Sequence, residues 1–225
     1  MVARNPSSGA EVWRTSTATD GANPTSGCNS SPAVGADGTV YVACDDGILY
    51  ALDGTDGSMV WSVEVSNDLS GSSELIKGRS PVVVPGTDRD WIYVTGAGDN
   101  LNFVIVDGLT GLADVDWMWN YGEALSSVTV FSDGGFALVW GDGNQQVLDV
   151  WGPYLFEWYD NLGVYDPDAW LVGSVHAEFL SSMGFLYVAT AEGMLYGYYL
   201  PVGLYDGVGA FPKFRSDTGN TGQRF

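Results

Sequence analysis

Three features of the 225-residue chain predict an all-β fold of repeated four-stranded antiparallel sheets. A unit of short apolar segments recurs with a period of about 48 residues. Turn residues, chiefly glycine and aspartate, separate these segments, as they do between paired antiparallel strands. No stretch of useful length has the apolar spacing of an amphipathic helix. We therefore expect the regular structure to consist of strands.

The clearest copy of the repeat spans residues 31–61, where four apolar segments alternate with turns. A second copy begins at Ser80, a third and weaker copy at Ser127, and a fourth near Val175. Residues 1–18 supply only the outer strand of a further copy. The repeat therefore accounts for nearly the whole chain.

A four-stranded sheet of this size cannot bury both of its faces alone, so such sheets pack face to face as the blades of a propeller. We expect one β-propeller domain over residues 1–225, with about four blade-equivalents. The expected parts are residues 1–27 for the outer strand of a shared blade, 28–76, 77–125 and 126–172 for three blades, and 173–225 for the last blade and a closing segment.

Two ways of closing the ring remain open at this point. The strand expected at residues 11–16 can complete the last sheet and close a four-bladed ring within one chain. Alternatively, two copies related by a two-fold axis exchange outer strands and form an eight-bladed ring. The second arrangement predicts a homodimer, and a fragment of a longer protein is also consistent with the repeat count.

Three stretches have the composition of an aspartate or asparagine turn. They begin at Asn5, Asp53 and Asp107, and in each a glycine stands four residues later. The first side chain can accept hydrogen bonds from its own backbone, while glycine adopts the left-handed conformation. A tryptophan follows in the outer strands, at Trp13, Trp61, Trp117 and Trp158. We expect each tryptophan to cover the turn of its own repeat.

At these positions the chain resembles the quinoprotein-type (PQQ-repeat) β-propellers, whose blade motif has alanine, aspartate, glycine and tryptophan at fixed offsets. The matching residues are Ala51, Asp53, Gly57 and Trp61, and, with asparagine at the aspartate position, Ala3, Asn5, Gly9 and Trp13. Asp107 and Gly111 also match, although Trp117 stands two residues late. The fourth segment lacks the aspartate, the glycine and the tryptophan. The resemblance implies a β-propeller fold.

Dehydrogenases of that family hold a quinone over a calcium ion, in a ring much longer than this chain. No constellation in this sequence maps onto that site, so we predict no cofactor. Residues 45–47 and 53–57 keep calcium open as an alternative, since carboxylates and glycine turns suit this ion. Ordinary turn chemistry accounts for both stretches better, because each falls where the repeat requires a turn.

Cys28 and Cys44 flank a segment that predicts a strand, a turn near residues 36–37 and a second strand. This arrangement brings the two cysteines within bridging range. The sequence leaves two states open, a disulfide or two free buried thiols. A zinc site has almost no ligands available, because the chain has one histidine and no closely spaced pair of cysteines.

The charge excludes two classes of partner. Twenty-eight acidic residues against 8 basic ones give a formal net charge of −20, which repels nucleic acid and anionic lipid headgroups. No apolar run is long enough to span a membrane. The acidic, loop-rich composition is typical of an extracellular or periplasmic protein. Residues 1–6 lack the apolar core of a signal peptide, so we expect the native export signal to be missing from this chain.

Two groups of residues are candidates for binding or chemistry. His176, the only histidine, and Glu178 would face the same side of an inner strand, where we expect hydrogen-bonded channel lining rather than a proton-transfer pair. Residues 159–170 have the composition of a long irregular loop. Its aromatic side chains, Tyr159, Tyr165 and Trp170, suit stacking on a sugar or a protein hot spot. Packing between blades is the alternative role of these aromatics.

The sequence therefore predicts a non-catalytic PQQ-like propeller that serves as an exported scaffold for binding or assembling proteins or glycans. The alternative is a fragment of a propeller enzyme, either a quinoprotein dehydrogenase or a carbohydrate-active enzyme.

Overall fold

The structure is a computed structural model. It describes residues 1–17, 27–65, 80–95, 103–119, 123–124, 127–130, 136–141, 145–151, 158–164, 179–180, 183–189 and 195–200. All regular structure in these ranges is β, as the sequence predicts. Across the same ranges, no helix with the length and hydropathy of a membrane span is found.

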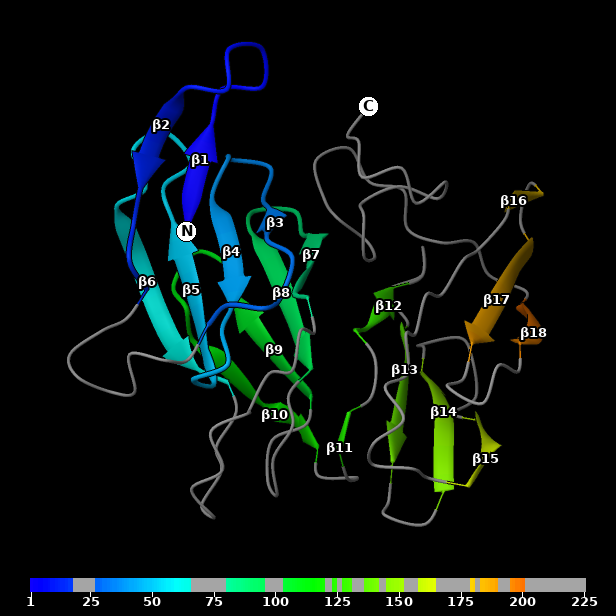
Figure 1. The fold of residues 1–225 in the computed structure, drawn as a ribbon. Coiled ribbons are helices and arrows are strands. Elements are labelled where there is room, and N and C mark those ends of the chain that lie inside the picture. Colours follow the sequence, from blue (N-terminus) through cyan, green and yellow to red (C-terminus); the bar gives the residue numbers. More distant parts are fainter. Residues whose placement is uncertain are drawn as a thin grey trace.

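The strands of the described ranges form five antiparallel sheets, numbered here in chain order (Figure 1). The first sheet contains β1 (Val2–Arg4) and β2 (Glu11–Arg14). The second contains β3 (Ala33–Val34), β4 (Val40–Ala43), β5 (Ile48–Leu52) and β6 (Met59–Glu64). The third contains β7 (Val82–Pro85), β8 (Asp90–Thr95), β9 (Phe103–Asp107) and β10 (Ala113–Trp119). In the second and third sheets each strand pairs with its neighbours in sequence.

The fourth and fifth sheets continue the antiparallel pattern. The fourth contains β11 (Glu123–Ala124), β12 (Thr129–Val130), β13 (Phe136–Gly141), β14 (Gln145–Trp151) and β15 (Trp158–Val164). Both β11 and β12 pair with β13. The fifth contains β16 (Phe179–Leu180), β17 (Met183–Ala189) and β18 (Leu195–Leu200).

Neighbouring sheets pack face to face through apolar side chains. Leu49 and Ala51 of the second sheet share a buried cluster with Ile92 and Val104 of the third. A separate cluster joins the third sheet to the fourth, where Phe103 stacks on Phe136 with ring centroids 4.5 Å apart. The central strand β9 is buried along its whole length, because it has a neighbouring sheet on each face.

Hydrogen bonds from serine also join the sheets, at the start of each inner strand. The backbone N–H of Ser31 donates to Oγ of Ser80 at 2.9 Å, and the N–H of Ser80 donates to Oγ of Ser127 at 2.8 Å. Ser80 is buried. A polar group buried there without a partner would be destabilising, so these bonds fix how the second, third and fourth sheets meet.

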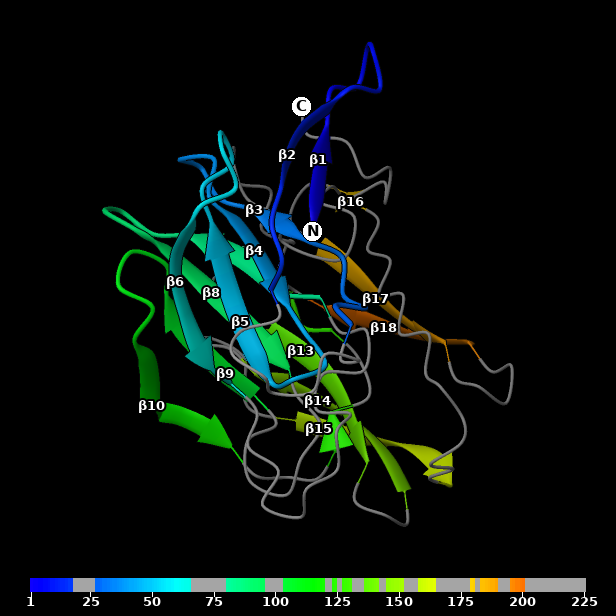
Figure 2. The same cartoon turned by 60° about the vertical axis from the view of Figure 1, so that its left-hand side comes forward.

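A disulfide anchors the start of the second sheet, since Cys28 and Cys44 are bonded to each other. Of the two states that the sequence leaves open, the structure has the bridged one. The sulfur of Cys44 is buried beside Val42 and Tyr50, and Met1 of the N-terminal hairpin packs against this cluster. Figure 2 shows the hairpin of β1 and β2 lying alongside the second sheet.

Two expectations about strands are corrected. Residues 159–164, expected as the start of an irregular loop, belong to β15 together with Trp158, which was expected in a strand. Tyr159 lies opposite Asp149 on β14. Gly163 is accommodated where the register shifts between Gln146 and Val147, as is common for glycine near a bulge. Residues 1–17 provide two strands rather than one, and within the described ranges β2 pairs only with β1. The pairing that would close a four-bladed ring through β2 is therefore not observed there.

Candidate functional site at the repeated turns

The same turn occurs three times, at residues 5–9, 53–57 and 107–111, and it is called the first, second and third turn below. In the first turn Oδ1 of Asn5 accepts the N–H groups of Ser7 and Ser8 at 2.9 and 3.0 Å. In the third turn Oδ1 of Asp107 accepts those of Leu109 and Thr110, also at 2.9 and 3.0 Å. Asparagine and aspartate are favoured here because their side chains replace backbone acceptors in tight turns.

The second turn follows the same plan, with one addition. Oδ1 of Asp53 accepts the N–H of Thr55 at 2.7 Å and its hydroxyl at 2.5 Å. Both bonds lower the pKa of Asp53, and the bond from the Thr55 hydroxyl has the larger effect. In all three turns the closing glycine donates its N–H to the carbonyl of the first residue at 2.8 Å. The glycines have φ values of 70°, 74° and 71°. Residues other than glycine adopt this left-handed backbone conformation only at a cost in free energy.

Trp13 and Trp61 cover the turn of the following repeat, which corrects for these two residues the expectation that each tryptophan covers its own turn. Nε1 of Trp13 donates to the carbonyl of Gly54 at 2.9 Å, and Nε1 of Trp61 donates to that of Gly108 at 3.0 Å. The reason is geometric. Side chains stand nearly perpendicular to a sheet, so an indole on an outer strand points at the neighbouring sheet rather than along its own.

The indole rings lie directly on the closing glycines. A Cβ atom placed on Gly57 would lie 2.6 Å from Cε3 of Trp13, and one placed on Gly111 would lie 2.8 Å from Cδ2 of Trp61. At the first turn, by contrast, no heavy atom of the described residues lies within 4 Å of a Cβ placed on Gly9. Glycine is thus required twice over at the second and third turns, by its φ angle and by the indole.

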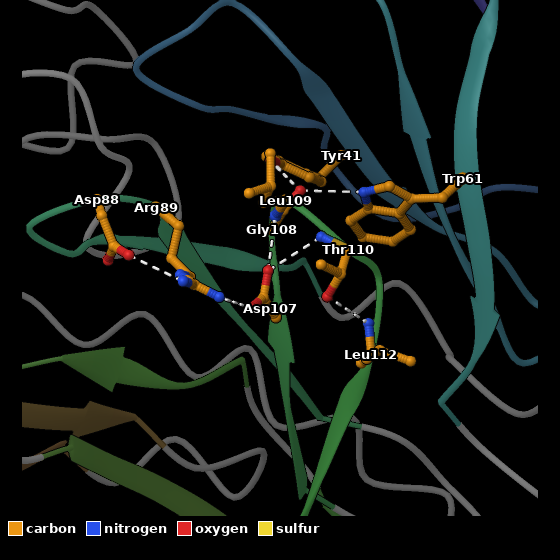
Figure 3. Close-up of polar contacts among 9 residues, drawn as sticks. All are labelled: Tyr41, Trp61, Asp88, Arg89, Asp107, Gly108, Leu109, Thr110 and Leu112. Atoms are coloured by element: carbon orange, nitrogen blue, oxygen red, sulfur yellow. Dashed lines mark hydrogen bonds and ion pairs between the residues drawn. The ribbon is translucent and has the colours of Figure 1, made fainter.

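Only the third turn carries an ion pair (Figure 3), among the residues that the structure describes. Nη1 of Arg89 lies 2.5 Å from Oδ2 of Asp107, and its Nη2 lies 2.8 Å from Asp88. Partial burial acts to raise the pKa of Asp107. The bonds from Arg89 and from the N–H groups of Thr110 and Leu109 outweigh burial and hold the pKa below its usual value. Bonds to Asp88 and Asp107 likewise raise the pKa of Arg89.

The other side of the third turn is closed by Tyr41, whose hydroxyl donates to the carbonyl of Gly108 at 3.4 Å. The ring centroids of Tyr41 and Trp61 are 5.7 Å apart. Burial and the nearby carboxylates of Asp37 and Asp90 raise the pKa of the Tyr41 hydroxyl. The hydroxyl therefore stays protonated and keeps donating at any physiological pH.

The third turn also differs in what it exposes. Leu109 and Leu112 are 67% and 70% exposed. Counted from the first residue of each turn, the same two positions hold Ser7 and Ala10 in the first repeat and Thr55 and Ser58 in the second.

The quinone and calcium site of the resembling dehydrogenases does not fit the described residues. Carboxylates considered for calcium already accept hydrogen bonds from the protein. Asp46 accepts them from Tyr50 Oη at 2.8 Å and from the N–H of Ile48 at 3.1 Å, and Asp45 accepts one from Nδ2 of Asn29. No group of three or more metal-binding side chains occurs in the part of the chain that the structure describes. The absence of a cofactor remains a prediction.

The remaining candidate residues are placed only in part. Ala3 lies in β1 and Ala51 in β5, paired with Trp13 and Trp61 respectively. Trp117 belongs to β10, and Trp158 and Tyr159 belong to β15. The described ranges do not include four of the candidate binding residues, Tyr165, Trp170, His176 and Glu178.

Two functional features of the turns escape sequence reasoning. The charged residues 88–90 predict a solvent-exposed hairpin tip. In the structure, Arg89 lies in the connection between β7 and β8 and donates a hydrogen bond to Asp107 at the end of β9. Only the scarcity of bases among so many acids hints at such a role. Leu109 and Leu112 could be found by aligning the repeats, because apolar residues replace mainly polar ones there.

An indole over an aspartate turn joins the first sheet to the second and the second to the third, and this repeated arrangement is that of a PQQ-type repeat protein. The family model described as outer membrane protein assembly factor BamB matches residues 1–149, which is more than half of the chain. The chain belongs to this PQQ-repeat β-propeller family, as the sequence motif predicts.

Two solved structures are similar to the chain at low identity. BamB from Moraxella catarrhalis is 15% identical, with a TM-score of 0.44, and the match covers 85% of this chain and 63% of that one. The computationally designed Ika4 protein is 12% identical, with a TM-score of 0.45, and the match covers 85% of this chain and 99% of that one. The chain thus spans less than two thirds of that BamB structure. No curated protein matches the chain.

Proposed function

We propose that the chain is a non-catalytic, exported scaffold that binds proteins during assembly of the outer membrane. The observation that carries this proposal is how the repeated carboxylates are used. Asp53 and Asp107 accept backbone N–H groups of their own turns, so these carboxylates hold structure rather than a substrate. Rigid sheets that present turns at their ends suit recognition of another protein.

The family supplies the direction of the proposal. Its model carries the description outer membrane protein assembly factor BamB. A periplasmic or extracellular location agrees with that description, and so does the disulfide between Cys28 and Cys44, since disulfides persist in oxidising compartments. A protein partner is favoured over a glycan, because the aromatics that suggested sugar stacking include Tyr159, which lies in a strand.

The proposed architecture is a propeller of four-stranded blades, with about four blade-equivalents per chain. The face-to-face packing of the second, third and fourth sheets supports it. We further propose that two chains complete an eight-bladed ring. Light scattering of the purified chain at low and high concentration, in low and high salt, tests this pairing. A dimer at every condition is expected, whereas a monomer at every concentration contradicts the paired ring.

The proposed function is tested by cross-linking the tagged chain, exported to the periplasm of a Gram-negative bacterium, and identifying the attached proteins. Enrichment of outer-membrane assembly proteins over a tag-only control is the expected result. The alternative, a fragment of a propeller enzyme, is tested on the purified chain with pyrroloquinoline quinone plus calcium and with a panel of oligosaccharides. Saturable binding of either, without enrichment of assembly proteins, overturns the scaffold proposal.

A further inference from the structure

The third turn presents two leucines to solvent on a well-anchored backbone. Single exposed leucines are common on soluble proteins. Leu109 and Leu112 differ because one lies within a tight turn and the other directly after it. Each is 67% or more exposed, at positions that are mainly polar in the other two repeats. Figure 3 shows Leu109 beside Gly108 within this turn and Leu112 just after it.

The backbone below the leucines is held from several directions. Asp107 bonds two N–H groups inside the turn, and Arg89 holds Asp107 from outside. Trp61 and Tyr41 both donate to the carbonyl of Gly108. A turn fixed in this way loses little conformational entropy when its side chains enter a partner, so its apolar contacts contribute more fully to affinity.

Carboxylates surround the turn. Asp88 is exposed beside Arg89, and Gly108 donates its N–H to the carbonyl of Asp90 at 2.8 Å. Asp90 also accepts the N–H of Ala36 at 3.0 Å, and it lies, like Asp37, close enough to Tyr41 to raise the pKa of that hydroxyl. Arg89 is the one base among these neighbours, and the whole chain carries a net charge of −20. The apolar pair is therefore set in a negative surround, which disfavours a second copy of this chain and an anionic membrane.

We propose that the third turn docks on a partner protein whose apolar surface is bordered by basic side chains, with Leu109 and Leu112 as the inserted residues. This inference rests on the proposed function, because it names the surface through which the scaffold binds protein. Buried aliphatic anchors provide the affinity, and the surrounding carboxylates select the partner by charge.

The test uses a fluorescent peptide made of leucine and lysine, which folds into a helix with an apolar face bordered by ammonium groups. Its affinity for the full chain is measured by anisotropy at physiological ionic strength. The variant Leu109→Thr/Leu112→Ser gives the third turn the side chains of the second turn, so it preserves the fold. We expect this variant to bind about tenfold more weakly or worse, as loss of two apolar anchors implies.

The matched control is Val12→Ser/Leu195→Ser, which removes two exposed apolar side chains elsewhere, and it should bind like the unmodified chain. A peptide of serine and lysine with the same charge should be insensitive to both double variants. Equal loss in the two variants, no loss in either, no binding by the unmodified chain, or leucine-dependent binding to phosphatidylglycerol vesicles would each overturn the proposal. Leucine-dependent peptide binding without cross-linked assembly proteins would overturn only the proposed function.

Discussion

The indole Nε1 of Trp13 donates a hydrogen bond to the carbonyl of Gly54, which lies 41 positions later, in the turn between β5 and β6 of the next sheet. The same bond joins Trp61 to Gly108 across 47 positions. Each bond is accompanied by ring contact with the closing glycine of the same turn. A tryptophan of this motif is therefore a joint between sheets, and its substitution should weaken the packing of two repeats together.

Trp61→Phe should lower the free energy of unfolding by about 1–2 kcal/mol, because an aromatic ring remains but the bond to Gly108 is lost. Trp61→Ala should lower it by about 3–5 kcal/mol, as ring contacts are lost as well. Urea denaturation measures both. A phenylalanine variant as unstable as the alanine variant would mean that the hydrogen bond, and not the ring, dominates the joint.

Gly57→Ala should be more destabilising than Gly9→Ala. Both substitutions place alanine at a positive φ, which we expect to cost about 1 kcal/mol. At Gly57 the new methyl group also meets Trp13 and Thr15, which adds about 1–3 kcal/mol for overpacking. Thermal and urea unfolding of the two variants provide the comparison. Equal losses would show that the indole yields without penalty.

Asp107→Asn should lower the free energy of unfolding by about 1.5–3 kcal/mol at neutral pH, because the charged bond from Arg89 is lost. The pKa of Asp107 is lowered on folding, so its stabilisation is complete above the unfolded value of about 3.9 and disappears as pH falls through the folded value. The difference in free energy of unfolding between the Asp107→Asn variant and the unmodified chain should therefore become smaller as the pH is lowered.

Urea denaturation from pH 7 down to the acid limit measures that difference. Asp53→Asn is the matched control, since Asp53 occupies the same turn position and its carboxylate is bonded by Thr55 rather than by an arginine. Its effect at neutral pH should be the smaller one. A difference for Asp107→Asn that stays constant with pH would contradict the assigned ion pair.

Reduction of the bond between Cys28 and Cys44 should lower the free energy of unfolding by about 3 kcal/mol, as expected for a closed loop of this length. The double variant Cys28→Ala/Cys44→Ala should lose a similar amount and become insensitive to reductant. Unfolding with and without reductant, together with titration of free thiols, checks both statements. Free thiols in the oxidised native chain would contradict the bond.

Local structure was predictable because short-range chemistry decides it. The turns at Asn5, Asp53 and Asp107 follow from one side chain and one glycine each, so residue spacing is sufficient to place them. Glycine and proline in the residues after Tyr159 predict a loop, whereas Tyr159 pairs with β14 as part of a strand. Long-range pairing overrode local composition there.

The joints between sheets were harder to predict, because sequence spacing does not say which neighbour a side chain meets. The spacing predicts that Trp61 covers the turn of its own repeat, yet its indole donates to Gly108 in the next one. Ser31, Ser80 and Ser127 recur visibly at the starts of the repeats, but their mutual bonds depend on how the sheets are stacked. Arg89 finds Asp107 only after β8 and β9 have paired.

The four bonds from tryptophan and serine that join the described repeats have the same polarity. Trp13, Trp61, Ser31 and Ser80 are donors in the earlier repeat, and their acceptors lie in the later one. In these bonds a repeat accepts hydrogen bonds from the repeat before it and donates hydrogen bonds to the repeat after it, which is a head-to-tail arrangement. A repeat added by gene duplication would meet a donor in the repeat before it and an acceptor in the repeat after it. The number of repeats can therefore change in evolution while the sequences of the existing repeats stay the same.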